Sequence, residues 1–217
     1  DDIEFNPKHI NVVNFDIEVA SDDGFPTPDA AAYPVISIAL KSSKSSVYQV
    51  WGLGSYDPSQ TKLDMQGDQI QYHHCKSEEE LLALFLGYWV KNYPDIITGW
   101  NTRFFDIPYI VNRIKNIGSE EAAKRLSPWK MVDERTRTIM GREQVAYDIS
   151  GIQQADYLEL FKKFGYSYGA QESYKLDHIA YTVLGEKKLS YEEHGNLFTL
   201  YKNDHQKFID YNIKDVQ

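Results

Sequence analysis

The feature that most constrains this chain is a short segment, Val12–Val19, that carries two carboxylates among apolar residues. Apolar and polar side chains alternate along it, and this period of two predicts a β-strand with one apolar face. Asp16 and Glu18 share the other face with Asn14, so their side chains leave the strand about 6–7 Å apart. Neighbouring carboxylates repel each other, and acidic residues are depleted in strands. The pattern predicts a cation-binding pair, with an ordinary solvated pair at a sheet edge as the alternative.

Composition limits the class of protein. Of the 217 residues, 42% are hydrophobic and 14% aromatic, which predicts a folded globular chain with a sizeable core. No apolar run approaches the ~18 residues of a membrane helix, and the first residues do not form a signal peptide. The single cysteine, Cys75, excludes an internal disulfide and indicates a reducing compartment. The net charge of −9 argues against a general nucleic-acid coat but suits a protein that binds cations.

The order of expected elements favours a mixed α/β sheet that begins as an antiparallel meander. We predict strands at residues 12–19, 35–40, 47–51, 70–74 and 96–100, and a hairpin at 132–150 that turns at 140–142. We predict helices at residues 77–94, 107–118, 153–164, 173–184 and from 204 onward. No repeat or linker interrupts the chain, so we expect one domain. Ligand sites in such sheets lie beyond the strand ends, where Asp16 and Glu18 are expected.

A second candidate segment follows the last predicted strand of the sheet. Asp106 precedes a helix with Pro108 in its first turn, which on its own predicts an ordinary helix N-cap. The same position, directly after a buried strand, also brings its carboxylate to the end of the sheet where the first pair lies. Phe104 and Phe105 beside Arg103 are either core residues or stacking faces and a phosphate contact for single-stranded nucleic acid.

The third candidate segment is the helix expected from residue 204, with Asp204 as its N-cap. Tyr211 and Asp215 are four residues apart and therefore share one face of this helix. The helix dipole disfavours a carboxylate in the last turn, and no Gly, Asn or Pro follows to end the helix. We therefore expect the helix to continue beyond the given sequence, with Asp215 held in mid-helix by a cation.

These segments resemble the three exonuclease motifs of family B DNA polymerases. The motifs are Phe15-Asp16-Ile17-Glu18, the segment 101–106, and Tyr211 with Asp215 in the pattern Tyr-x-x-x-Asp. They are similar to those of the four-carboxylate proofreading exonucleases that have a tyrosine in the third motif. The likeness covers nearly the whole chain and extends in particular to replicative polymerases of T-even-type tailed phages.

The resemblance implies a ribonuclease-H-like fold, with a mixed β-sheet flanked by helices and a protruding β-hairpin, and a 3′→5′ exonuclease that removes nucleotides from DNA ends. It further implies that residues 1–217 are a single domain excised from a larger DNA polymerase. The expected partners are a single-stranded DNA 3′ end or primer terminus and the polymerase domains of the same parent chain, with no membrane. The expected location is cytoplasmic, in the host cell if the chain is of phage origin.

Carried over to this sequence, the resemblance implies that Asp16, Glu18, Asp106 and Asp215 hold two divalent metal ions, Mg²⁺ or Mn²⁺. Two such ions roughly 3.5–4 Å apart would bracket the 3′-terminal phosphodiester. Asp16 would bridge both ions, Glu18 and Asp215 would complete the first, and Asp106 would reach the second. Tyr211 would orient the attacking water.

The resemblance also implies substrate contacts. It places Asn101 near the substrate and Phe105 near the terminal base, and Arg103 is the expected phosphate contact. The hairpin at 132–150 resembles a strand-separating hairpin that helps to move a primer end between sites, with a plain surface hairpin as the alternative.

Two other functions remain open from the sequence. One is a catalytically silent ribonuclease-H-like module that only binds DNA or braces a polymerase. The other is a stand-alone nuclease of DNA or RNA, which the expected continuation of the last helix disfavours. The presence of all four carboxylates together with Tyr211 favours the active exonuclease over the silent module.

Overall fold

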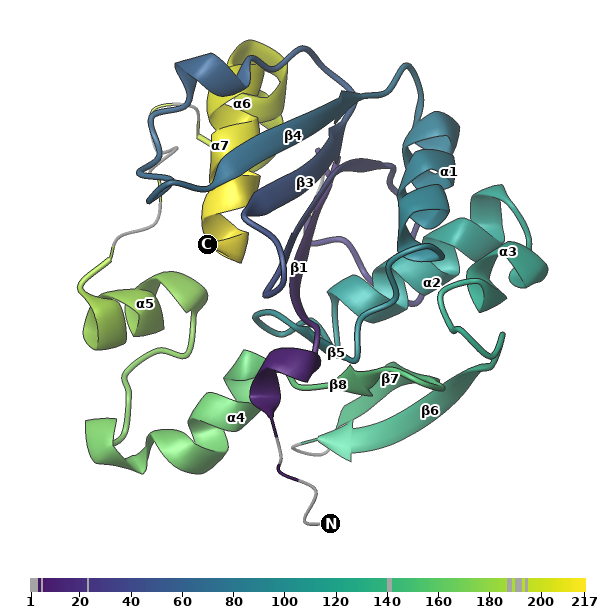
Figure 1. The fold of residues 1–217 in the computed structure, drawn as a ribbon, viewed down its shortest axis with the longest axis vertical. Helices are drawn as coiled ribbons and strands as arrows, with labels where there is room; N and C mark the ends of the chain where they lie inside the picture. The colour runs from purple at the N-terminus through teal and green to yellow at the C-terminus, as the bar shows by residue number, and fades with distance from the viewer. Residues whose placement is uncertain are drawn as a thin grey trace.

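The computed structural model describes residues 4, 6–22, 24–139, 142–186, 189, 193 and 195–217. Its main feature is a six-stranded sheet with the order β4-β3-β2-β1-β5-β8 (Figure 1). The strands are β1 (Val12–Val19), β2 (Val35–Ser42), β3 (Val47–Gly52), β4 (Gln69–His74), β5 (Ile96–Thr98) and β8 (Gln153–Gln154). The first three form the predicted antiparallel meander, and the remaining neighbours pair in parallel. The mixed sheet confirms the predicted α/β class.

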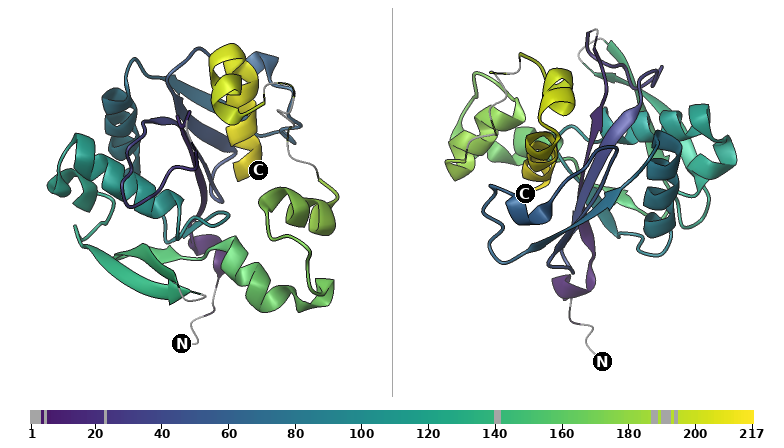
Figure 2. Two further views of the ribbon diagram at one scale, coloured as in Figure 1. Left: turned by 180° about the vertical axis from the view of Figure 1, so that it is seen from behind. Right: turned by 90° about the horizontal axis from the view of Figure 1, so that it is seen from above.

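Helices cover both faces of this sheet, as the end-on view in Figure 2 shows. One face carries α1 (Glu78–Trp89), α2 (Asp106–Ile117) and the short α3 (Glu120–Lys124). The other carries α6 (Leu197–Asn203) and α7 (His205–Val216), with α5 (Leu176–Leu184) near the C-terminal end of α7 and α4 (Tyr157–Phe164) near β8. Single 3₁₀ turns are η1 (Pro7–His9), η2 (Pro58–Gln60) and η3 (Gly165–Tyr168). This arrangement agrees with the expected ribonuclease-H-like layers.

Strand β1 divides two hydrophobic cores. Val13, Phe15 and Ile17 are buried on the side of α1 and α2, where the Phe15 ring lies 5.8 Å from that of Phe85. The core on the opposite side of the sheet includes Phe208 and residues of β2, β3 and α6. The polar face of β1 therefore points at α7, and the apolar face anchors the strand.

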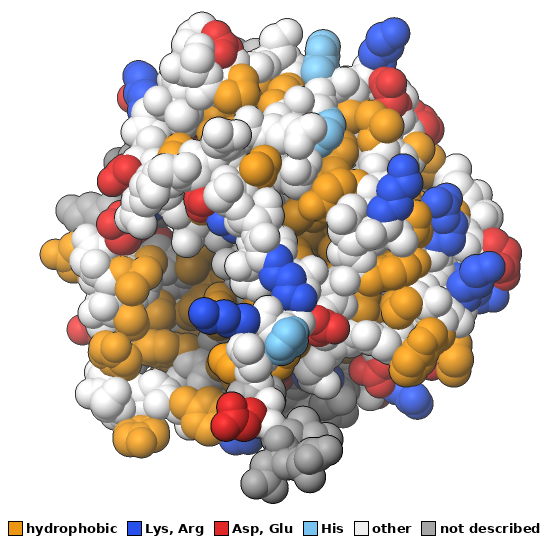
Figure 3. Space-filling view, viewed as in Figure 1, with side chains coloured by type: hydrophobic (Ala, Val, Ile, Leu, Met, Phe, Trp, Pro, Cys, Tyr) orange, Lys and Arg blue, Asp and Glu red, His pale blue; other side chains and the backbone are white. Residues whose placement is uncertain are grey.

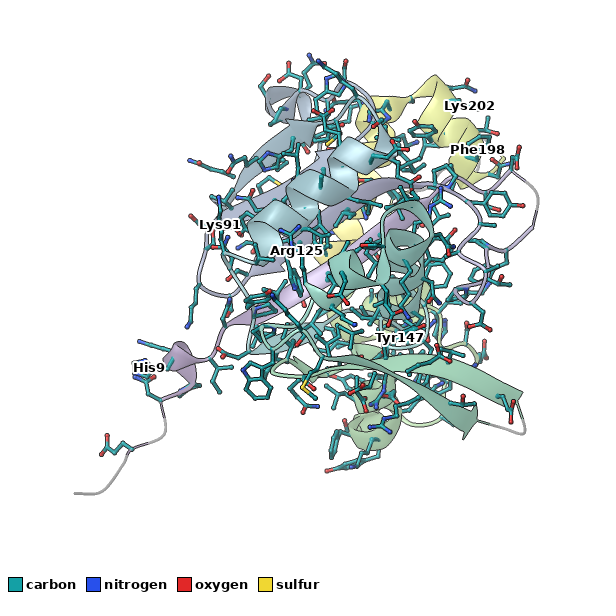
Figure 4. All side chains as sticks on the ribbon, turned by 90° about the vertical axis from the view of Figure 1, so that its right-hand side faces the viewer. His9, Lys91, Arg125, Tyr147, Phe198 and Lys202 are labelled. Atoms are coloured by element: carbon teal, nitrogen blue, oxygen red, sulfur yellow. The ribbon has the colours of Figure 1, made fainter. Side chains whose placement is uncertain are left out.

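Hydrogen bonds and a buried ion pair hold α2, which begins at Asp106, in place. Arg113 and Glu78 pair through two contacts of 2.7 Å, and their side chains are largely buried. On the side of the hairpin, β6 (Val132–Ile139) and β7 (Arg142–Ile149), the Tyr147 hydroxyl donates to Asn112 Oδ1 at 2.6 Å. Figure 4 labels Tyr147 at this junction. The predicted hairpin is confirmed, although residues 140 and 141 of its turn lie outside the described part of the chain.

The structure corrects several sequence-based boundaries. Residues 153–164 do not form one helix, because Gln153 and Gln154 pair with β5 and the helix begins only at Tyr157. The strand predicted at 96–100 ends at Thr98, where the chain turns through Asn101, whose φ is 62°. The helix predicted from 173 begins at Leu176. Helices α3 and α6 were not predicted, because five- and seven-residue helices carry too few turns to show a period.

Candidate active site

Three of the predicted carboxylates meet at the end of β1, although they come from distant parts of the chain. One oxygen from each of Asp16, Glu18 and Asp215 lies within 4.8 Å of the others. Glu18 is buried, and the other two are half-buried. Carboxylates that share a site and lose water are disfavoured as ions unless positive charge is nearby. This oxygen-only donor set fits a hard divalent cation such as Mg²⁺ or Mn²⁺.

Asp106 reaches the same region from the first turn of α2. Strand β5 pairs with β1 only as far as Asn14, so the later part of β1 has an open edge. There Asp106 Oδ1 accepts the Ile17 N–H at 3.1 Å. The alternative interpretation, an ordinary N-cap, is wrong, because Phe105 holds that position and makes no side-chain cap. The carboxylate of Asp106 is tied to β1 instead.

Burial dominates the electrostatics of Asp106. Loss of water is the largest cause that raises the pKa of its carboxyl group to about 7, and the nearby carboxylates of Asp156 and Asp215 contribute in the same direction. The Ile17 N–H opposes this shift. A cation in the cleft would favour the ionised form, so the charge state of Asp106 is expected to depend on metal binding.

The predicted residues line one open cleft of about 900 Å³. Those found there are Asp16, Glu18, Asn101, Phe105, Asp106, Tyr211 and Asp215. The cleft therefore joins the acidic cluster to a tyrosine hydroxyl, an amide and an aromatic ring, which is a suitable lining for a nucleotide bound through metal ions.

Several known proteins are similar to this chain in sequence. A family model described as DNA polymerase family B, exonuclease domain, matches residues 1–179. The chain is 38% identical, over 99% of its length, to the DNA-directed DNA polymerase of Escherichia phage RB69, and 32% identical, over its whole length, to that of Enterobacteria phage T4. It is 31% identical over 82% of its length to the DNA polymerase delta catalytic subunit of Candida albicans.

This chain belongs to the exonuclease domain family of the family B DNA polymerases. As such it is a 3′→5′ exonuclease of the proofreading type. It spans about a quarter of the length of the two phage polymerases, at 25% and 26%. The family model ends before α7, whereas the match to the T4 phage polymerase includes that helix. Within the described residues, no helix is long and apolar enough to cross a membrane.

One predicted substrate contact lies away from the cleft of the exonuclease domain. Arg103 is not among the residues that line the cleft, and its guanidinium lies 3.3 Å from the Glu159 carboxylate. The turn after β5 reverses direction within a few residues, so Asn101 and Arg103 point to different sides of it. The phosphate contact predicted for Arg103 is not supported by this placement.

Sequence reasoning missed an aromatic side chain at the rim of the exonuclease cleft. Phe25 is 79% exposed, and its ring lies 5.3 Å from that of Phe105. The Phe105 ring in turn lies 5.8 Å from that of Tyr109. A large aromatic residue between Gly24 and Pro26, in a loop that cannot bury it, was the signal available in the sequence.

A second missed residue, Asn212, contacts the acidic cluster of the exonuclease domain through Asp16. It is fully buried, and its Nδ2 donates to Asp16 Oδ2 at 2.7 Å. The Ser37 hydroxyl donates to Asn212 Oδ1, also at 2.7 Å. Because the carboxylate only accepts, the amide nitrogen must face Asp16, and the serine fixes that orientation. A buried amide next to Tyr211, within an otherwise apolar helix face, was the sequence signal.

A smaller, mostly apolar cavity of about 390 Å³ adjoins the cleft. It lies between α4, α5 and the end of α7, and it shares Trp100, Leu176 and Asp215 with the exonuclease cleft. Figure 3 shows hydrophobic side chains gathered around a hollow in this region.

Proposed function

We propose that this domain hydrolyses the 3′-terminal phosphodiester of single-stranded DNA with two divalent cations, Mg²⁺ or Mn²⁺. The observation that carries the proposal is the acidic cluster, in which three carboxylates from β1 and α7 approach within 4.8 Å. Asp16, Glu18 and Asp215 would hold one cation, and Asp16 with Asp106 the other. Such cations, when bound, lower the pKa of the attacking water and stabilise the departing 3′ oxygen.

The side chains around the cluster have separate tasks in this proposal. Tyr211 lies one helical turn before Asp215 and lines the cleft while only 5% exposed, so its hydroxyl can orient the attacking water. Asn101 and Phe105 line the side of the cleft where the terminal nucleotide would bind. The phenyl face offers stacking to any base, which suits an enzyme that must remove all four nucleotides.

The biological setting is also proposed. Residues 1–217 would act as one proofreading domain of a longer DNA polymerase in the cytoplasm of a phage-infected cell. The support is the pair of phage DNA polymerases, each about four times the aligned length, to which the chain is similar. The partner domains would deliver a frayed primer end, because a matched end must first lose pairing that is worth a few kcal/mol.

The test uses a 5′-labelled single-stranded DNA oligonucleotide incubated with the 217-residue chain in Mg²⁺ and, separately, in EDTA. We expect stepwise shortening from the 3′ end in Mg²⁺ only, and slower shortening of a fully paired duplex. A 3′-phosphorothioate end distinguishes the polarity, because it slows a 3′→5′ enzyme alone. Tight binding without cleavage in Mg²⁺ would instead identify the silent module.

A further inference from the structure

The turn that carries Asn101 into the cleft has an unusual backbone. Asn101 has a φ of 62°, in the left-handed region, which asparagine adopts more readily than most other residues that carry a side chain. The turn also presses against β1, since a Cβ at Gly99 would lie 2.5 Å from the Phe15 carbonyl oxygen. Backbone of this kind persists only where surrounding contacts determine it.

A single buried carboxylate supplies these contacts. Asp156 is only 3% exposed, and it accepts the N–H of Asn101 at 3.2 Å and that of Arg103 at 3.0 Å. The same side chain caps α4 by accepting the N–H groups of Leu158 at 2.8 Å and Glu159 at 3.4 Å. Asp156 thus joins the start of one helix to the turn that leads into another.

Capping of α4 alone does not account for an aspartate here. Serine and asparagine cap helices about as well, without a buried negative charge. The two oxygens of a carboxylate can both accept, whereas an amide offers one acceptor and one donor. The N–H of Asn101 faces one oxygen of Asp156 and the N–H of Arg103 faces the other, so both positions need an acceptor, which a carboxylate provides and an amide does not.

Two further hydrogen bonds align the same segments. The Tyr157 N–H donates to the Gly99 carbonyl at 2.9 Å, and the Thr98 hydroxyl donates to the Ala155 carbonyl at 2.6 Å. The start of α4 therefore lies in a fixed position beside the turn. Within this set, the side chain of Asp156 is the one that contacts the turn itself, at the N–H of Asn101 and at the N–H of Arg103.

We propose that Asp156 is a positioning residue for the exonuclease reaction, which holds the Asn101 turn in the left-handed conformation that presents the Asn101 amide to the DNA 3′ end. The inference rests on the proposed function, because it assigns the Asn101 side chain to the bound nucleotide. Asp156 itself touches neither the nucleotide nor the metal ions in this proposal. Its effect on DNA binding should therefore pass entirely through Asn101.

The first test is Asp156→Ser, which keeps a helix cap but is too short to reach the turn. We expect kcat/KM on a single-stranded oligonucleotide in Mg²⁺ to fall by roughly ten- to a hundredfold, as for a misplaced positioning group. Oligonucleotide affinity measured by fluorescence anisotropy in EDTA should fall as well. The matched control is Asp204→Ser, the same exchange at the N-cap of α7, where the side chain accepts the Lys207 N–H. The control should keep the parental kcat/KM.

The second test separates positioning from other roles. Asn101→Gly, which removes the amide but tolerates the left-handed backbone, should lower kcat/KM about as much as Asp156→Ser, and the double variant should lose no more than the worse single variant. Mn²⁺ affinity measured by calorimetry should fall far less in Asp156→Ser than in Asp16→Ala, since Asp156→Ser removes a nearby charge but no proposed ligand. Multiplying effects, a loss of Mn²⁺ affinity as large as that in Asp16→Ala, or parental behaviour of Asp156→Ser would each overturn the inference.

These measurements also separate the two proposals. If the parent chain cleaves no DNA in Mg²⁺, the proposed function fails, whereas the anisotropy cycle in EDTA still tests the link between Asp156 and Asn101. If the parent cleaves and the cycle shows independent effects, only the positioning role of Asp156 is wrong.

Discussion

The two halves of the cleft are built in different ways. The half formed by β1 and α7 presents Asp16, Glu18 and Asp215 from regular elements, and a buried amide, Asn212, contacts the cluster. The half formed by the β5–α2 turn presents Asn101 from an irregular backbone. In the first half, a regular strand and a regular helix bring the charged side chains together. In the second half, hydrogen bonds between distant parts of the chain hold an uncharged side chain, that of Asn101, in the cleft.

This difference predicts how each half fails. Loss of a side chain from the β1–α7 half should remove metal ions and chemistry while the fold remains. Loss of a contact in the turn half should displace the DNA end while the metal ions remain. Substitutions in each half therefore test whether metal binding and DNA binding depend on different halves of the cleft.

The largest effect is expected from Asp16→Ala and Asp215→Ala. Each removes a proposed ligand of the metal site, so cleavage of a single-stranded oligonucleotide should fall by roughly a thousandfold or more. The melting temperature in metal-free buffer should stay the same or rise, because crowded like charges are relieved. Glu121→Ala, on exposed α3, is the control and should remain fully active. If both cleft variants melt clearly lower than the parent, these carboxylates are structural and the division is wrong.

A smaller loss is expected from Tyr211→Phe, which keeps the ring in its buried place and removes one hydroxyl. If the hydroxyl orients water, kcat should fall by roughly ten- to a thousandfold with little change in KM. Calorimetric titration with Mn²⁺ provides the second measurement, and it should give the parental affinity. Strongly weakened Mn²⁺ binding would show that Tyr211 acts on the metal site rather than on the water.

Much of the first half could be predicted from the sequence, for physical reasons. Strand alternation places Asp16 and Glu18 on one face, and helical spacing places Tyr211 and Asp215 on one face. Both depend only on local periodicity. The contact between Asp106 and the Ile17 N–H depends on more than local periodicity, since it requires β5 to end three residues earlier on β1.

The second half could not be predicted in the same way. The strand at Gln153–Gln154 is too short to show a period, so the segment was assigned to the following helix. The contact of Asp156 with Asn101, across 55 residues of sequence, is visible only in the fold. Arg103 beside two phenylalanines resembled a DNA contact, yet the turn directs it to Glu159. Contacts between distant, irregular parts of the backbone produce no periodic pattern in the sequence, so the sequence does not predict them.

A loss of metal affinity is expected from Asn212→Leu, which removes the amide that contacts Asp16. Groups that orient metal ligands typically change metal affinity by about 10- to 100-fold when they are replaced. We expect Mn²⁺ affinity to fall by this amount, in contrast to Asp156→Ser. Ser37→Ala, which removes only the group that orients the amide, should have a smaller effect in the same direction. Equal Mn²⁺ affinities in Asn212→Leu and the parent would show that Asp16 needs no such support.

The smallest effect concerns Asp106, the buried carboxylate between the two halves. Its folded-state pKa of about 7 lies above the ordinary value of 3.8, so burial of the ionised form opposes folding at high pH. As pH falls, Asp106 takes up a proton in the folded state before it does so in the unfolded state. Protonation of Asp106 should therefore increase the stability of the metal-free parent as pH falls from about 7 to about 4. Asp106→Asn keeps an oxygen for the Ile17 N–H but cannot ionise.

In metal-free buffer at pH 8 we therefore expect Asp106→Asn to melt several degrees above the parent, since 1 kcal/mol corresponds to about 2–4 °C in a chain of this size. At pH 5 the gap should shrink, because the parent carboxyl is then largely protonated in the folded state. Subtracting the two melting curves removes the titration of all other groups, which the proteins share. Added Mg²⁺ should narrow the gap at pH 8, because a bound cation stabilises the ionised carboxylate of the parent alone. If the difference in melting temperature is the same at both pH values, the carboxyl group of Asp106 ionises in the folded state as an exposed carboxyl group does, and burial does not raise its pKa.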